Sequence, residues 1–264
     1  MKLSTLAYTA GLLDGDGHIG VSRWQRKNQY QVITYCVDIN VTNQSRALVN
    51  WLVLHFGGKI KRYVSTAGNE YFVWCCTGKE AQKSFLGSVM PYLRIKQQYA
   101  ECLIRFLKIE GKLPEQRAEC WRQRKALQQL KSVTTDTQNV FDKDDKLQMA
   151  YIAGMIDTDG HISKANSHWM VGLTNIHKPT LMTLQNTFGG SLWGRQRPTN
   201  RVPCFDFAVH GTHIVERLLL AILPYLIVKR DKALQALNDI RKKTMIQSDL
   251  IGNNERDLVG TLAS

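Results

Sequence analysis

The strongest constraint on the fold is a 14-residue segment that occurs twice in the chain. Leu6–Ile19 (LAYTAGLLDGDGHI) returns 143 residues later as Met149–Ile162 (MAYIAGMIDTDGHI), with 9 of the 14 positions identical. Self-similarity at this scale is the mark of a repeated structural unit. We therefore expect two copies of one unit, and 264 residues are enough for two domains of ordinary size.

Two shorter matches follow each copy in the same order. VTN at 41–43 corresponds to LTN at 173–175, and PYL at 91–93 corresponds to PYL at 224–226, at offsets of 132 and 133. Because these offsets are smaller than 143, the first repeat must carry a longer segment between His18 and Val41. A bulge or longer hairpin around Arg26–Gln29 would account for it.

Each repeat has the pattern of a helix, two strands, a helix, two strands and closing helices. Apolar residues fall on every second position from Ile33 to Val41, as in a strand with one buried face. The repeated helices are expected at Thr5–Asp14 and Lys146–Asp157, the second capped by Asp144 or Asp145. The order predicts an α+β protein of two pseudo-symmetric αββαββα repeats, each with a curved antiparallel four-stranded sheet. The expected divisions are a first repeat over 1–111, a linker with a helix over 112–143, a second repeat over 144–246 and a tail over 247–264.

The charge favours a polyanionic partner. Lys and Arg number 35 against 22 Asp and Glu, which gives a net charge of +13. The alternative is an ordinary basic protein, because net charge does not define a site. No run of about 18 apolar residues predicts a membrane span, and no targeting segment is apparent, so we expect an intracellular protein. The six cysteines form no CxxC pair, which favours reduced thiols over a zinc site.

The segments AGLLDGDG at 10–17 and AGMIDTDG at 153–160 resemble the signature of the LAGLIDADG homing endonucleases. The same strand and helix order follows both copies, so the resemblance covers nearly all of residues 4–243. Thr9 and Ile152 depart from the signature at its first position, which is a packing position. The resemblance implies a DNA endonuclease whose two motif helices pack together and whose sheets bind DNA.

The chemistry of the motif can also be argued from its residues. Small residues such as Gly11 and Gly154 let two helices approach backbone to backbone, which brings Asp16 and Asp159 together at the helix C-termini. Two carboxylates there oppose the helix dipoles and repel each other, an arrangement that suits Mg²⁺. The resemblance implies the same metal role and adds the carbonyls of Gly15 and Thr158. The alternative is that both Asp-x-Asp-Gly segments are plain turns that end helices.

The other motif residues have matching positions in the two halves. Asp14 and Asp157 are expected to be structural, as caps that hold the turns. His18 and His161 are expected to open the first strands; the alternative is a general-base or metal role. Lys96 and Lys229 follow the PYL segments, where a lysine could stabilise a transition state or lower the pKa of water; the alternative is a surface lysine at a helix start. Asn43 and Asn175 are candidates to orient water, or N-caps of the next helices.

The outward face of each sheet is the expected DNA-binding surface, lying in the major groove. Residues of the linker helix, including Arg122, Arg124 and Lys125, are expected to contact phosphates. The two faces differ in sequence, which favours an asymmetric target. The candidate base-contacting residues are Ser22, Trp24, Arg26, Thr34, Cys36, Asp38, Asn40, Lys61, Tyr63, His168, Arg195 and Arg197.

These observations leave three functions open. The first is a monomeric homing endonuclease, needing no protein partner, that cuts double-stranded DNA with Mg²⁺ and promotes mobility of its host intron. Mn²⁺ would substitute, and Ca²⁺ would bind without turnover. The second is an intron RNA maturase on the same scaffold. The third is a DNA-binding regulator without cleavage, which the presence of both Asp16 and Asp159 disfavours.

Overall fold

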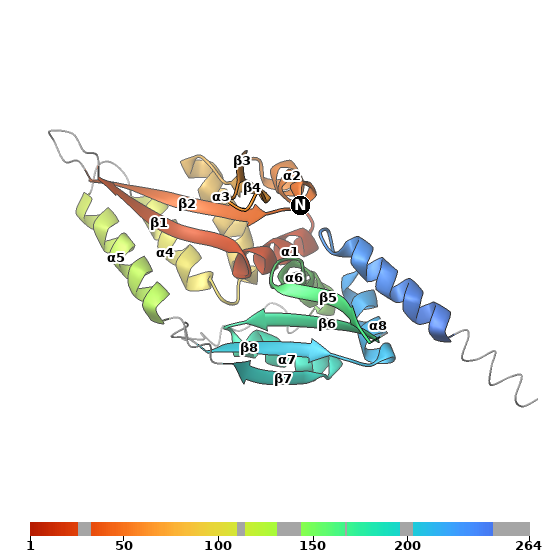
Figure 1. Cartoon of the computed structure of the whole chain (residues 1–264). Helices are drawn as coiled ribbons and strands as arrows, with labels where there is room; N and C mark the ends of the chain where they lie inside the picture. The colour runs from red at the N-terminus through yellow and green to blue at the C-terminus, as the bar shows by residue number, and fades with distance from the viewer. Residues whose placement is uncertain (26–32, 110–113, 131–143, 167, 196–202, 245–264) are drawn as a thin grey trace, which may run out of the picture.

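The computed structural model shows the expected duplication directly (Figure 1). It describes residues 1–25, 33–109, 114–130, 144–166, 168–195 and 203–244. The first half contains α1 (Leu3–Asp14), β1 (Gly17–Gln25), β2 (Ile33–Asn43), α2 (Arg46–Phe56), β3 (Lys59–Val64), β4 (Glu70–Cys75), α3 (Lys79–Val89), the short 3-10 helix η1 (Met90–Tyr92) and α4 (Gln97–Lys108). The second half contains α6 (Asp145–Asp159), β5 (Gly160–Ala165), β6 (His168–Asn175), α7 (Lys178–Phe188), β7 (Ser191–Arg195), β8 (Cys204–Val209), α8 (Thr212–Ile222) and helical residues 230–244. The predicted α+β repeat is confirmed.

The two sheets have the same topology. The strand orders are β1-β2-β4-β3 and β5-β6-β8-β7, and every pair is antiparallel. The β1–β2 pair extends to Gln25 and Ile33, whereas β5–β6 ends at Ala165 and His168, so the longer hairpin predicted for the first half is present. Arg26–Gln29, where a bulge was predicted, lies outside the described residues, as do the predicted linker at 132–139 and the tail at 247–264.

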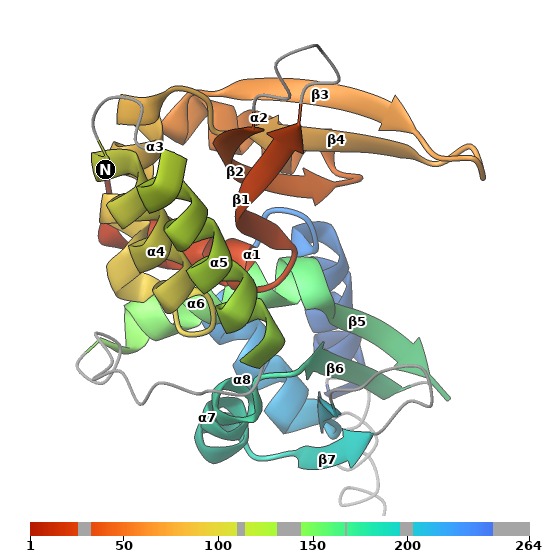
Figure 2. The same ribbon diagram turned by 90° about the vertical axis from the view of Figure 1, so that its left-hand side faces the viewer.

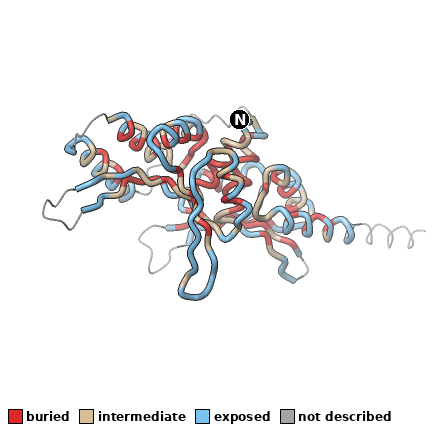
Figure 3. The backbone as a smooth tube through the Cα atoms, turned by 90° about the horizontal axis from the view of Figure 1, so that it is seen from above, coloured by how far each residue is buried: buried red, intermediate tan, exposed pale blue. Residues whose placement is uncertain are grey.

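Helices α1 and α6 pack side by side between the two sheets (Figures 1 and 2). Buried residues concentrate in the middle of the molecule (Figure 3). A Cβ atom placed on Gly11 would lie 2.1 Å from the carbonyl oxygen of Tyr151, and one placed on Gly154 would lie 2.2 Å from that of Tyr8. The two backbones are therefore in direct contact at this pair of glycines. The predicted reason for small residues in the motif is thus confirmed.

The ends of the two motif helices differ, which sequence matching did not indicate. Helix α1 stops at Asp14 as predicted, but α6 continues through Thr158 to Asp159 instead of stopping at Asp157. Thr158 keeps helical hydrogen bonding, and its hydroxyl donates to the carbonyls of Gly154 and Met155. The N-cap of α6 is Asp144, which was one of the two predicted residues.

The linker contributes one long helix, α5 (Pro114–Leu130), as predicted. It lies against α4 and along β1 at the outer side of the first sheet (Figure 2). The described part of the second half has no equivalent of α5. The two halves therefore offer the same sheet and motif helix but different surroundings at the edge of the sheet.

No helix in the described residues is both long enough and apolar enough to cross a membrane. All six cysteines are free thiols.

Candidate active site

Asp14 and Asp157 anchor the segments that carry the two matching lysines. The carboxylate of Asp14 accepts hydrogen bonds from the backbone N–H groups of Arg94, Ile95 and Lys96 at 2.8, 3.1 and 2.9 Å. That of Asp157 accepts from Ile227, Val228 and Lys229 at 2.7, 3.1 and 2.8 Å. Both aspartates are structural, as expected, but the expectation that they cap the turns was wrong. Each carboxylate instead holds a backbone segment that is distant in sequence. The N–H groups of that segment supply the hydrogen-bond donors that a buried carboxylate needs.

Each of these aspartates is also bound by a tyrosine from the other motif helix. The Tyr8 hydroxyl donates to Asp157 at 2.7 Å, and the Tyr151 hydroxyl donates to Asp14 at 2.8 Å. Burial and the adjacent carboxylate raise the pKa of each tyrosine well above its ordinary value, so both remain donors. Both tyrosines belong to the repeated segment, but the sequence alone indicates no role for them.

We expect Tyr8→Phe to destabilise the protein by about 1–2 kcal/mol, because it leaves one oxygen of buried Asp157 short of a donor. Thermal unfolding measures this effect. Tyr63→Phe is the control, since Tyr63 is exposed, and its unfolding temperature should match the wild type. Equal unfolding temperatures for Tyr8→Phe and the wild type would contradict the importance of this contact.

Lys96 and Lys229 lie at matching positions but make different contacts. The Lys96 ammonium donates to the carbonyls of Leu13, Gly15 and Gly17 at 2.5, 3.0 and 2.8 Å, whereas that of Lys229 donates to the carbonyl of Asp157 at 2.7 Å. Burial lowers the pKa of both lysines, and the neighbouring aspartates oppose this shift. Both lysines lie in the site, so the surface alternative is wrong. Lys96 ties the first motif turn together.

Asp16 and Asp159 face the same place at the ends of the motif helices. A Cβ atom on Gly15 would lie 3.4 Å from an oxygen of Asp159, which shows how closely the two turns approach. Asp159 is half-buried; burial and the negative charge of Asp16 raise its pKa to about 6. Asp16 is more exposed, but loss of solvation also raises its pKa. The predicted meeting of the two carboxylates is present.

The raised pKa of Asp159 should make the stability of the metal-free protein depend on pH. A folded pKa near 6, above the ordinary 3.8, means that ionisation of this carboxyl destabilises the fold above about pH 6, and that the penalty vanishes near pH 4. Asp159→Asn should therefore raise the unfolding free energy by about 1–3 kcal/mol at pH 7.5 in EDTA. The gain should disappear toward pH 4. A gain of the same size at both pH values would show that charge is not its cause.

The two matching asparagines differ in their contacts. Asn175 donates to Asp159 at 2.9 Å, while its carbonyl oxygen accepts from the N–H of His177 at 2.9 Å. Asn43 accepts from the N–H of Ser45 at 2.8 Å. The N-cap alternative was wrong for both, because Ser45 and His177 cap the following helices. Asn175 instead holds Asp159 in place.

The donor set at this place fits Mg²⁺. Within the described part of the chain, no three His, Cys, Asp or Glu side chains gather as a closed metal cage. A pair of carboxylates with backbone carbonyls nearby leaves room for water and phosphate oxygens, which is how Mg²⁺ is commonly held. The Gly15 carbonyl already accepts from Lys96, but a carbonyl oxygen has two lone pairs and can serve a metal as well.

The sheet positions proposed to contact DNA share one face in each half. Cross-strand pairing places Ser22 opposite Cys36, and Trp24 opposite Thr34, with Asp38 and Asn40 farther along the same face. Ser22 donates to Asp38. Lys61 and Tyr63 continue this face on β3, and Tyr63 stacks on Tyr71 with ring centroids 5.2 Å apart.

The second sheet presents His168 and Arg195 on its corresponding face. Arg195 forms an ion pair with Asp206 at 3.1 Å, so it is not a free guanidinium. Trp193, 46% exposed, lies on the same face and was missed, although its spacing of two from Arg195 could have indicated it. Arg26 and Arg197 lie outside the described residues.

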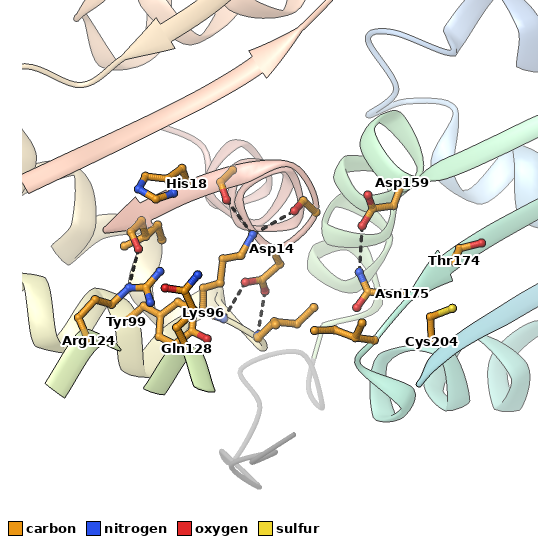
Figure 4. A pocket seen from close by; sticks show the side chains of 15 residues that line it. Asp14, His18, Lys96, Tyr99, Arg124, Gln128, Asp159, Thr174, Asn175 and Cys204 are labelled. Atoms are coloured by element: carbon orange, nitrogen blue, oxygen red, sulfur yellow. Dashed lines mark hydrogen bonds between the residues drawn. The ribbon is translucent and has the colours of Figure 1, made fainter. Parts of the chain in front are cut away.

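A cleft of about 430 Å³ opens beside the two motif turns. Its walls come from both halves and from the linker helix, as Figure 4 shows. The polar residues that line it include Asp14, His18, Lys96, Arg124, Gln128, Asp159 and Asn175. The cleft is open. It is lined by the carboxylates of Asp14 and Asp159, by the cations Lys96 and Arg124, and by Gly15 and Gly17 on either side of Asp16.

Several solved structures with the same architecture are DNA complexes. I-SmaMI bound to uncleavable DNA has a TM-score of 0.66 at 16% identity, and the match covers 94% of each chain. The LAGLIDADG homing endonuclease I-GzeII in complex with its DNA target has a TM-score of 0.65 at 11% identity, over 92% of this chain and 91% of that one. I-LtrWI, a LAGLIDADG homing endonuclease bound to target DNA, has a TM-score of 0.60 at 13% identity, over 92% of each chain.

Two further I-SmaMI structures, at 17% and 16% identity, are described as bound to cleaved DNA and as bound to uncleaved DNA in the presence of calcium ions; their TM-scores are 0.58 and 0.57. The first covers 95% of this chain and 93% of that one, and the second covers 95% of each. No protein-family model and no curated protein sequence matches the chain. The likeness therefore concerns the fold, which is the two-repeat LAGLIDADG fold over nearly the whole chain.

Proposed function

We propose that this chain, which has the fold of the LAGLIDADG homing endonucleases, is a site-specific endonuclease that makes a double-strand break in an asymmetric DNA target. The observation that carries the proposal is the meeting of Asp16 and Asp159 between two polar sheet faces. An inactive relic of the fold would have no need to keep two mutually repelling carboxylates, one with a pKa raised to about 6. The DNA complexes of the structural neighbours support the same substrate.

The residues of the site have separate tasks in this proposal. Asp16 and Asp159, with the Gly15 and Thr158 carbonyls, would hold Mg²⁺. When bound, the ion activates a water molecule and stabilises negative charge on the phosphate. Asn175 keeps Asp159 turned into the cleft through its 2.9 Å hydrogen bond. Lys96 and Lys229 add two positive charges, which favour the approach of a phosphate and stabilise charge that develops during hydrolysis.

The two sheets would hold the duplex in register while the site acts on it. One chain supplies both carboxylates and both sheets, so no second subunit is needed to complete the site. The outward residues of the two sheets differ, as Cys36 and Asp38 against His168 and Met170 show. Because the two sheets present different side chains, each should bind a different half-site sequence, which favours an asymmetric target. Intron mobility would follow from cleavage at a vacant insertion site.

Cleavage of a randomised duplex library in Mg²⁺, with parallel reactions in Ca²⁺ and EDTA, tests the proposal. We expect cutting at one long site in Mg²⁺, binding without cutting in Ca²⁺, and neither product nor nick in EDTA. Sequencing the cut ends gives the target. Binding without cutting in Mg²⁺ and Mn²⁺ would reject the endonuclease and direct attention to intron RNA as the ligand of a maturase.

A further inference from the structure

The linker helix α5 places a buried arginine at the active-site cleft. Arg124 is 7% exposed. Its Nε donates to the carbonyl of Ile19 at 2.8 Å, and its guanidinium lies 3.9 Å from the centroid of the Tyr99 ring. These contacts fix the plane of the guanidinium. Its Nη1 is buried and has no hydrogen-bond partner among the residues that the structure describes.

The carboxylates of Asp14 and Asp159 line the same cleft as Arg124 but are not paired with it. Among the described residues, no carboxylate forms an ion pair with it. The charged groups that face it include other cations, because Lys96 lies in the same cleft and the positive charge of Arg124 helps to lower the pKa values of His18 and Lys96. A buried cation without a counter-ion is costly. A second cation nearby adds to that cost, so the arrangement favours an anionic ligand.

Arg124 lies where the active-site cleft meets a second groove. It lines the active-site cleft together with Lys96 and Asp159, and it lines an adjoining groove between β1 and α5 together with Trp24 and Lys125. Figure 4 shows its guanidinium turned toward Lys96. A nucleic-acid strand that passes from the groove into the cleft would bring a phosphate past this guanidinium.

We infer that Arg124 binds a backbone phosphate of the DNA at the first-half side of the active site. The inference rests on the proposed function and assigns Arg124 as a positioning residue. A planar guanidinium suits a phosphate because it can donate two parallel hydrogen bonds. The described second half has no helix in the place of α5. One strand of the duplex is therefore held by an additional cation that the other strand lacks.

The other linker cations provide a contrast. Arg122 is exposed and pairs with Glu119 at 2.7 Å, and Lys125 is exposed. The sequence predicted phosphate contacts for all three residues. The structure separates Arg124 from them by its burial, its fixed plane and its place in the cleft.

The test uses Arg124→Met, which keeps a long apolar stem on Tyr99, and Arg124→Lys, which keeps the charge. Arg241→Met is the matched control, because Arg241 is an exposed cation on the last described helix that pairs with Glu216. The probe is the duplex that the wild type selects from the library, bound in Ca²⁺ over about 50–200 mM salt. Thermal unfolding of each variant is measured first, and binding is measured well below its midpoint.

We expect Arg124→Met to weaken binding about tenfold and to reduce the salt slope by about one phosphate contact. Arg124→Lys should retain the slope, and Arg241→Met should behave as the wild type. Arg124→Met should also slow the cutting of one strand more than the other, so that nicked duplex accumulates. A purely structural role would lower the unfolding temperature and slow both strands alike.

A methylphosphonate scan identifies the phosphate. Neutralising one backbone position should weaken the wild type and Arg124→Lys about tenfold but leave Arg124→Met unaffected. Equal sensitivity of the wild type and Arg124→Met at every position would overturn the inference while leaving the endonuclease intact. Failure of the wild type to bind any duplex would overturn the proposed function and this inference with it.

Discussion

Replacing Asp159 with asparagine is expected to reduce double-strand cleavage by about a thousandfold or more, while affinity for the target duplex in EDTA stays within about threefold of the wild type. Asparagine keeps the size of the side chain and can still accept from Asn175, but it removes the negative charge that a metal requires. Asp16→Asn should have the same effect. Single-turnover cleavage of a plasmid carrying the selected site measures both strands.

The two variants also test whether both carboxylates serve both strands. If the site is shared, each variant should lose double-strand cutting, and any remaining product should be nicked plasmid. Asp231→Asn is the control, because Asp231 is an exposed residue on the last described helix. Wild-type double-strand cutting by Asp159→Asn would reject the two-carboxylate assignment. Loss of DNA binding in EDTA by either variant would indicate that the carboxylate acts on the fold instead.

Replacing Gly154 with alanine should destabilise the protein by about 3 kcal/mol, which corresponds to a fall of about 6–12 °C in the unfolding midpoint. The new Cβ would lie 2.2 Å from the Tyr8 carbonyl oxygen and 2.8 Å from the Leu12 nitrogen. Both atoms belong to the backbone of α1, so no rotamer change can relieve the contact. The two helices must separate, which also moves Asp16 away from Asp159 and should reduce cleavage.

Gly87→Ala is the matched control. Gly87 lies inside helix α3, and a Cβ atom there would have nothing within 4 Å. Alanine is a better helix former than glycine, so this variant should equal or exceed the wild type by about 0.5–1 kcal/mol. An unfolding midpoint for Gly154→Ala equal to the wild type would contradict direct backbone contact between α1 and α6.

The sequence predicted the repeat, the strand faces and the meeting of the two aspartates. These features depend on periodicity and on residue size, which a sequence carries directly. The alternation from Ile33 to Val41 determined which side of β2 is buried, and the paired glycines predicted the helix contact. Both sheets have the same strand order, as two copies of one unit should.

Other features depend on contacts between segments that are distant in sequence, and the spacing of residues along the chain does not predict such contacts. Asp14 and Arg94 are 80 positions apart, and nothing in the sequence indicated that the Asp14 carboxylate accepts from the Arg94 backbone N–H. The burial of Arg124 follows from the position of α5 against β1, and a run of basic residues in a linker favours exposed phosphate contacts instead. The difference between α1 and α6 at their ends arises because threonine continues the helix where Gly15 stops it.

The tyrosine and aspartate contacts that cross between the motif helices have a consequence for how such a chain could be divided. Each half supplies the hydroxyl that completes the other half's carboxylate, so neither half is chemically self-sufficient when separated. Since Tyr8 and Tyr151, like Asp14 and Asp157, occupy equivalent positions, two copies of one half would meet the same need by reciprocal exchange. The fused chain thus retains the bonding pattern of a symmetric dimer, and a chimera built from halves of two such proteins should assemble where both crossed pairs are preserved.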